Sequence, residues 1–139
     1  MTGTALKSPT TTVSRVAIAI ASLLLVLFSS CTSAHERALV EAKSSVGGDP
    51  ERGAFLIQRY GCGGCHLIPG VAGAGGKAAP SLEHLAGRTY ISGSLPNTPQ
   101  NVMRWIKSPH SILPGTKMPE LGISDTDARD IATYLWSLR

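Results

Sequence analysis

The chain has 139 residues, of which 13 are Lys or Arg and 9 are Asp or Glu, and its aromatic content is only 5%. This length allows one small domain. Two of the basic residues, Lys7 and Arg15, precede Cys31. The chain from Cys31 onward therefore contains 11 basic and 9 acidic residues, a net charge of +2. No basic tract is present in the sequence to support nucleic-acid binding.

The N-terminal segment has the pattern of an export signal. An apolar run at residues 16–28 follows Lys7 and Arg15 and is followed by small residues at 29–31. The run is short for a membrane span, and the order basic, apolar, small is typical of a cleaved signal. We therefore assign residues 1–30 as a signal peptide of the lipoprotein type and predict export.

The fate of Cys31 decides where the exported protein resides. Residues 28–31 (Phe-Ser-Ser-Cys) resemble a lipobox, in which the cysteine is acylated and becomes the first residue of the mature protein. An unpaired exported cysteine is otherwise a liability, which favours lipidation. Cleavage after Ala34, releasing a soluble periplasmic protein, and an uncleaved anchor are the alternatives. We predict a protein on the periplasmic side of a bacterial membrane, lipid-anchored through Cys31.

The next segment marks the boundary between a linker and the folded domain. Residues 31–48 are polar and rich in Ala and Ser, which is typical of a tether. Asp49 and Pro50 predict a helix start, because Asp is a favoured N-cap and Pro is favoured at the first helical position. Gly53 within this helix indicates close approach by another helix. We therefore expect one domain over 49–139.

The motif Cys-Gly-Gly-Cys-His at residues 62–66 is the strongest functional signal in the chain. Two cysteines separated by two residues and followed at once by histidine form the attachment pattern of c-type haem. Each thiol adds to one vinyl group of the haem, and the adjacent His66 becomes the proximal ligand of the iron. We predict one haem c, bound covalently through Cys62 and Cys65.

Three other interpretations of the two cysteines are possible. A structural zinc site needs about four nitrogen or sulfur ligands, and His84 and His110 lie at spacings that fit no zinc finger. A redox dithiol lies at a strand-to-helix junction, but no apolar strand precedes Cys62. A disulfide unrelated to any cofactor is the third alternative.

The segment after the motif offers two further contacts to a haem. Residues 66–80 form a glycine-rich loop, and we expect the carbonyl of Pro80 to accept the Nδ1 proton of His66 and orient its ring. A short helix is expected at 81–87. An arginine beside a buried haem propionate offsets the desolvation of that carboxylate by bidentate hydrogen bonding, and Arg88 is our candidate.

A third helix is expected to begin at Thr98, which precedes Pro99 as a favoured N-cap. Val102, Trp105 and Ile106 form an apolar stripe along it at helical spacing. We expect Trp105 to pack on the haem and to donate a hydrogen bond to a propionate or to the axial sulfur.

The sixth ligand of the iron is expected from the loop at residues 113–119, which presents Met118. A thioether ligand raises the haem potential and blocks the iron to dioxygen, which suits an electron carrier. The rival Met103 lies off the apolar stripe of the third helix. His110 and Lys117 are the next candidates, in a non-native or alkaline form.

The last helix is expected to start at Ser124, which forms a capping box with Asp127. The apolar residues of this helix recur at helical spacing and are expected to cross the Gly53 side of the first helix. They are Ile131, Tyr134, Leu135 and Leu138.

Residues 49–139 resemble a class I, monohaem c-type cytochrome. The resemblance rests on the motif at 62–66, the Pro80 loop, Gly87-Arg88 and Pro-Gly-Thr-Lys-Met at 114–118. More narrowly, residues 79–82, 95–101 and 105–106 resemble the cytochrome c domain fused to subunit II of caa3-type cytochrome oxidases. The copper-binding cupredoxin domain of those proteins has no match in the 139 residues.

The resemblance implies an all-α cytochrome c fold, with three to five helices around one covalently attached haem and His66 and Met118 as axial ligands. We predict an electron carrier of a respiratory chain that passes single electrons to a terminal cytochrome oxidase, and neither an enzyme nor a binder of small-molecule substrates. The alternative is a haem enzyme or sensor with an open sixth coordination position.

Overall fold

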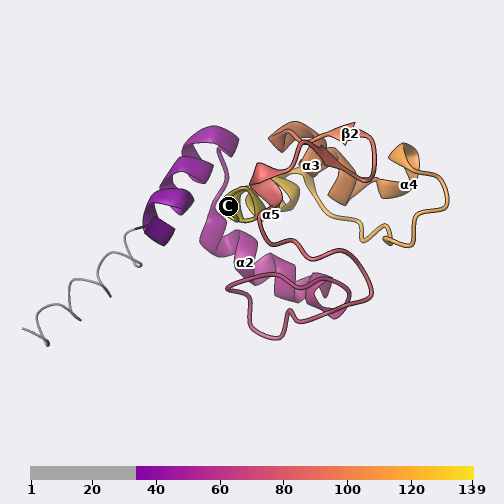
Figure 1. The fold of residues 1–139 in the computed structure, drawn as a ribbon, viewed down its shortest axis with the longest axis horizontal. Helices are drawn as coiled ribbons and strands as arrows, with labels where there is room; N and C mark the ends of the chain where they lie inside the picture. Colours follow the sequence, from indigo (N-terminus) through magenta and orange to yellow (C-terminus); the bar gives the residue numbers. More distant parts are fainter. Residues whose placement is uncertain (1–33) are drawn as a thin grey trace, which may run out of the picture. The chain divides into compact units, whose positions relative to one another are not determined.

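The computed structural model describes residues 34–139, so the assigned signal peptide and Cys31 lie outside the described residues. Residues 36–139 form one compact unit, built mainly of helices as expected (Figure 1). Within residues 34–139, no helix combines the length and apolar character that a membrane crossing requires. The helical elements are residues 34–46, α2 (Pro50–Arg59), α3 (Pro99–Lys107), α4 (Pro109–Ile112) and α5 (Asp125–Trp136), with 3-10 turns at Cys62–Gly64 and Leu85–Gly87.

The crossing of α2 and α5 forms the centre of the core. The side chain of Asp49 caps α2 by accepting the N–H groups of Glu51 and Arg52, as expected. A Cβ atom at Gly53 would lie 2.1 Å from the carbonyl oxygen of Asp130, so the expected close approach of the last helix is confirmed. Apolar side chains from both helices are buried there: Leu56, Ile57, Ile131 and Leu135.

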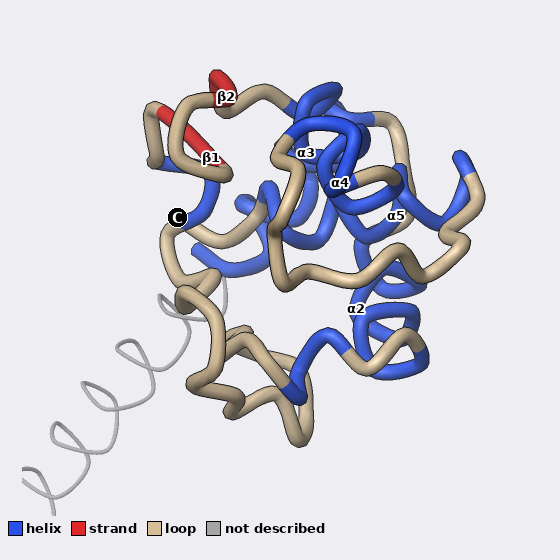
Figure 2. The backbone as a smooth tube through the Cα atoms, turned by 90° about the vertical axis from the view of Figure 1, so that its right-hand side faces the viewer, coloured by secondary structure: helices blue, strands red, loops and turns tan. Residues whose placement is uncertain are grey.

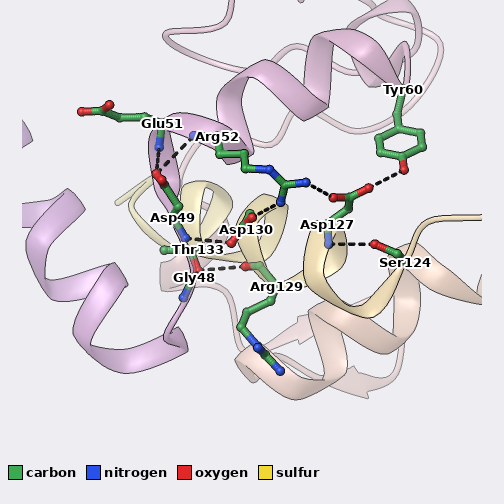
Figure 3. Close-up of polar contacts among 10 residues, drawn as sticks. All are labelled: Gly48, Asp49, Glu51, Arg52, Tyr60, Ser124, Asp127, Arg129, Asp130 and Thr133. Carbon is green, nitrogen blue, oxygen red and sulfur yellow. Dashed lines mark hydrogen bonds and ion pairs between the residues drawn. The ribbon is translucent and has the colours of Figure 1, made fainter.

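The start of α5 differs from the expected capping box. The Ser124 hydroxyl accepts the Asp127 N–H at 3.1 Å, which is the first half of the box. The Asp127 carboxylate instead pairs with Arg52 and accepts the Tyr60 hydroxyl at 2.7 Å. Through these two contacts the carboxylate joins α5 to α2 (Figure 3).

Residues 34–46, which the sequence analysis assigns to a tether, are helical and packed against the domain. Ala42 is 0% exposed, and Glu41 pairs with Arg139 at 2.8 Å. Two partly buried side chains of this helix also pack against the core: Leu39 and Val46. The expectation of a spacer was wrong, because these contacts hold the helix against the domain although no strong apolar face is visible in the sequence.

The turn between this N-terminal helix and α2 is bound to α5. The N–H of Gly48 donates to the Thr133 hydroxyl at 3.1 Å, and the N–H of Asp49 donates to the Asp130 carboxylate at 2.8 Å (Figure 3). A Cβ atom at Gly48 would lie 2.5 Å from the Thr133 hydroxyl oxygen. The chain therefore enters the domain along a fixed path.

Residues 81–87 form less helix than expected. Only Leu85–Gly87 is helical, as a single 3-10 turn, and its Leu85 is buried at 4% exposure. His84 has a φ of 54°, a left-handed conformation that interrupts a right-handed helix.

An antiparallel strand pair follows that the sequence analysis did not expect. Strand β1 (Tyr90–Ile91) pairs with β2 (Leu95–Pro96), with Tyr90 opposite Pro96. Ser92 and Gly93 have φ values of 47° and 90° and turn the chain between them. Such short strands carry too few alternating residues to show a period of two.

The packing of the N-terminal helix is testable with one buried and one exposed position. Ala42→Arg forces a charge into a site without space and should release the helix, so amide exchange over residues 36–46 should accelerate by about tenfold or more. Val40→Arg is the matched control, because Val40 is 68% exposed. Hydrogen exchange followed by mass spectrometry measures both variants, and equal exchange in the two would contradict the packing.

The link between Asp127 and α2 should depend on pH. Hydrogen bonds from Tyr60 and Arg52 hold the pKa of Asp127 below its ordinary value of 3.8. A carboxyl with a lowered native pKa stabilises the fold above its unfolded pKa, and this contribution is lost as the pH falls through the native pKa. Asp127→Asn should therefore lower the denaturant concentration at the unfolding midpoint at pH 7. In acid, where Asp127 is protonated, the variant and the unmodified protein should have similar midpoints.

The control for Asp127→Asn is Asp125→Asn at the same end of α5. Asp125 pairs with Lys107, but its side chain is 83% exposed. Exposed ion pairs contribute little to stability, so this variant should change the denaturation midpoint less. A smaller effect of Asp127→Asn than of Asp125→Asn at pH 7 would refute the assigned role.

Candidate cofactor site

The motif at residues 62–66 folds into a tight turn at the end of α2. Gly61, with a φ of 72°, lets the chain leave the helix in a left-handed conformation that favours glycine. The carbonyl of Cys62 then accepts the N–H groups of Cys65 at 3.2 Å and of His66 at 3.0 Å. The turn brings two free thiols and one imidazole into a short segment, with Cys62 partly buried and Cys65 exposed.

The environment of Cys62 differs from that of a redox dithiol. Burial raises the pKa of the Cys62 thiol above its ordinary value of 9.0, and the neighbouring Cys65 raises it further. The attacking cysteine of a dithiol oxidoreductase has a lowered pKa. The motif also follows helix α2 rather than a strand, so neither feature matches the dithiol alternative.

The imidazole of His66 has the orientation expected from the sequence. Its Nδ1 atom lies 2.7 Å from the carbonyl oxygen of Pro80. Because a carbonyl only accepts hydrogen bonds, Nδ1 carries the proton and donates it. The other ring nitrogen, Nε2, then has its lone pair available for a metal, and the bond at Nδ1 increases the basicity of the ligand.

The loop after the motif folds back on it through backbone hydrogen bonds. The N–H of Ala79 donates to the carbonyl of Cys65 at 3.0 Å, and the N–H of Leu82 donates to that of Leu67 at 2.8 Å. Gly76 lies so close that a Cβ atom there would be 2.4 Å from the carbonyl carbon of Cys65. Residues 79–82 thus run beside 65–67, which places Pro80 opposite His66.

Arg88 makes contacts that the sequence analysis did not foresee. Its Nη2 atom donates to the carbonyl of Ser81 and, at 2.9 Å, to the carbonyl of Glu83. An arginine has five N–H donors, so three remain for the propionate contact expected of Arg88.

Trp105 lies on the expected apolar stripe of α3. Thr98 caps that helix by accepting the Asn101 N–H at 3.2 Å. Val102 and Ile106 are 2% and 6% exposed, and Trp105 is partly buried against the same core. The stripe is confirmed as core, and the contact of Trp105 with a haem remains a prediction.

Met118 and Met103 occupy different surroundings. Met118 lies in the irregular segment between α4 and α5, partly buried against the core, and its N–H donates to the Thr116 hydroxyl at 3.3 Å. Met103 lines an open groove formed by α3, α4 and α5 beside Arg104 and Lys107. A methionine on an irregular segment has more freedom to meet an iron than one fixed on a helix, so Met118 stays the candidate ligand.

Asn97 is a structural residue of this region to which the sequence analysis assigned no role. Its Nδ2 atom donates to the carbonyls of Leu85 at 2.7 Å and Arg88 at 2.9 Å. Its buried Oδ1 atom has no hydrogen-bond partner in the described part of the chain. In the sequence, Asn97 stood out only as one of residues 95–101, which carry part of the family resemblance.

The donor set fits an iron that brings its own equatorial ligands. Among residues 34–139, no three His, Cys, Asp or Glu side chains gather in a way that would hold a metal ion. A structural zinc needs four such ligands. A haem iron takes four nitrogens from the porphyrin and needs only axial ligands from the protein, and the Nε2 atom of His66 is available as one of them.

Comparison with known proteins agrees with this geometry. The model of the family described as Cytochrome c matches residues 50–139. Cytochrome c-552 of Bradyrhizobium diazoefficiens is 30% identical over 98 residues, covering 70% of this chain and 83% of that protein.

Two further relatives are larger proteins. Cytochrome c oxidase subunit 2 of Bacillus subtilis is 34% identical over 95 residues, and that of Alkalihalophilus pseudofirmus is 32% identical over 89 residues. The matches cover 64% and 63% of this chain but only 26% and 25% of those proteins. With the family match spanning the motif turn, the Pro80 loop and α5, the chain belongs to the cytochrome c family, as a class I c-type cytochrome.

Proposed function

We propose that this protein is a monohaem electron carrier, with one haem c attached through Cys62 and Cys65 and ligated by His66. The observation that carries the proposal is the hydrogen bond from His66 Nδ1 to Pro80 at 2.7 Å, because it prepares Nε2 for an axial metal bond. When bound, the haem supplies one-electron chemistry by cycling between ferrous and ferric iron.

The residues of the chain have binding and positioning roles in this function. His66 would bind the iron through Nε2, Met118 would supply a thioether ligand, and Trp105 would pack against the macrocycle. Arg88 would offer its remaining N–H donors to a propionate. With His66 and Met118 as ligands, the haem would exchange electrons without binding a substrate at the iron, as a carrier requires; a haem enzyme or sensor would need the sixth position open.

We propose a terminal oxidase of a respiratory chain as the redox partner. Support comes from the relatives that are named cytochrome c oxidase subunit 2. The net charge of +2 from Cys31 onward is offset by the two haem propionates. Recognition of the partner should therefore depend little on long-range electrostatic steering.

The proposed location is the periplasmic side of a bacterial membrane, with lipid on Cys31 as the anchor. The compact unit begins at Glu36, five residues after Cys31. Five residues reach at most roughly 18 Å. An anchored haem domain would therefore stay close to the membrane surface, instead of exploring the reach of a long tether.

The function is tested by expressing the full chain in a bacterium that attaches haem and measuring its mass, its visible spectrum and its ability to reduce the oxidase in its membranes. We expect the mature protein to carry the added mass of one haem and to keep it after denaturation. We also expect the membrane fraction that contains the protein to show electron transfer to the oxidase. Cys31→Ser should release the protein from the membrane while keeping the haem. A mature protein without the added mass would refute the proposal.

The sixth ligand is tested with two methionine variants. Met118→Ala should lower the reduction potential strongly and convert the spectrum to high-spin, because a thioether ligand raises the potential of haem. Met103→Ala serves as control, since Met103 is fixed on α3, where it lines the groove formed by α3, α4 and α5, and the variant should leave the spectrum unchanged. A spectrum left unchanged by Met118→Ala would exclude Met118 as the ligand.

A further inference from the structure

We propose that Arg88 is a positioning residue for His66: it holds the backbone at residues 80–83 so that the Pro80 carbonyl stays in line with His66 Nδ1. This role goes beyond its expected contact with a haem propionate and rests on the proposed haem ligation by His66. The argument starts from the Pro80 carbonyl, which is the partner of the imidazole at 2.7 Å.

The Pro80 carbonyl needs support because its own segment is irregular. Pro80 is exposed and lies outside any helix or strand. Backbone bonds fix residues before and after Pro80, from the N–H of Ala79 to the carbonyl of Cys65 at 3.0 Å and from the N–H of Leu82 to the carbonyl of Leu67 at 2.8 Å. These bonds set the register of the two segments, but the carbonyls of Ser81 and Glu83 take no part in them and need other donors.

Arg88 supplies those donors. In the described part of the chain, no backbone N–H donates to the carbonyl of Ser81 or of Glu83. The Nη2 atom of Arg88 donates to both. The Ser81 carbonyl belongs to the residue directly after Pro80, so its orientation and that of the Pro80 carbonyl are linked through two backbone torsions.

Arg88 is itself held in place by Asn97. The Asn97 side chain donates to the carbonyls of Leu85 at 2.7 Å and of Arg88 at 2.9 Å. The backbone N–H of Asn97 donates to the carbonyl of Thr89 at 3.0 Å. These three bonds attach both ends of the Leu85–Arg88 turn to the base of the β1–β2 pair. Hydrogen bonds thus connect Asn97 to Arg88 and Arg88 to the Ser81 carbonyl. The peptide bond from Ser81 to Pro80 and the bond from Pro80 to His66 complete the connection.

The positioning role and a purely electrostatic role predict opposite changes in potential. A weaker bond at Nδ1 makes His66 a poorer electron donor, which favours ferrous iron and raises the potential. Loss of a positive charge near the haem favours ferric iron and lowers the potential. Arg88→Lys separates the two effects, because it keeps the charge but shortens the side chain and removes the planar donor group.

The experiment compares Arg88→Lys and Asn97→Ala with the unmodified full-length holoprotein. We expect both variants to raise the midpoint potential and to speed exchange of the His66 Nδ1 proton, measured by NMR in the ferrous state, by about tenfold or more. Arg104→Lys is the control: this exposed arginine of α3 pairs with Asn101 at 3.2 Å and should change neither value.

Two results would overturn the inference. Unchanged potential and proton exchange in both Arg88→Lys and Asn97→Ala would show that the Pro80 carbonyl is held without Arg88. A third variant, Arg88→Gln, removes the charge. A lower potential in this variant, with normal exchange of the His66 Nδ1 proton, would show that Arg88 acts through its charge alone. Either result leaves the electron-carrier proposal intact, since haem attachment and reversible reduction are read separately from the same samples.

Discussion

The contact between α2 and α5 at Gly53 determines where the functional residues lie. A side chain at this position would collide with the backbone of Asp130, so the two helices approach more closely than larger residues permit. The direction of α2 follows from this contact, and the motif at residues 62–66 lies directly beyond its end. Figure 2 shows α2 and α5 next to each other.

Charged groups around this crossing connect it to the rest of the chain. Arg52 of α2 pairs with both Asp127 and Asp130 of α5, and Asp130 also accepts the N–H of Asp49. The Asp130 side chain is 8% exposed, and a buried carboxylate is tolerated where it is paired and hydrogen-bonded. The helices thus form a fixed frame, while the proposed ligands lie on the connecting segments, as is usual for functional residues.

Local chemistry predicted more of this structure than long-range packing did. The caps at Asp49, Thr98 and Ser124 depend on a few neighbouring residues, and all three were expected and are present. The helix at 34–46 was missed because its packing depends on distant partners, such as Arg139 for Glu41. The contacts of Arg88 with the carbonyls of Ser81 and Glu83 were likewise missed, because nothing in the sequence shows that these carbonyls lack backbone donors.

The two proposed axial ligands are held to different degrees. On the His66 side, the imidazole is bonded to Pro80 and the backbone on both sides of Pro80 is bonded to the motif loop. On the other side, Met118 follows a segment rich in Pro and Gly, and its N–H makes one long bond of 3.3 Å to Thr116. Local opening costs least where bonds are fewest. Exchange of a ligand in the haem-bound protein should therefore begin at Met118, with the exposed Lys117 beside it as the nearest replacement, while His66 stays on the iron.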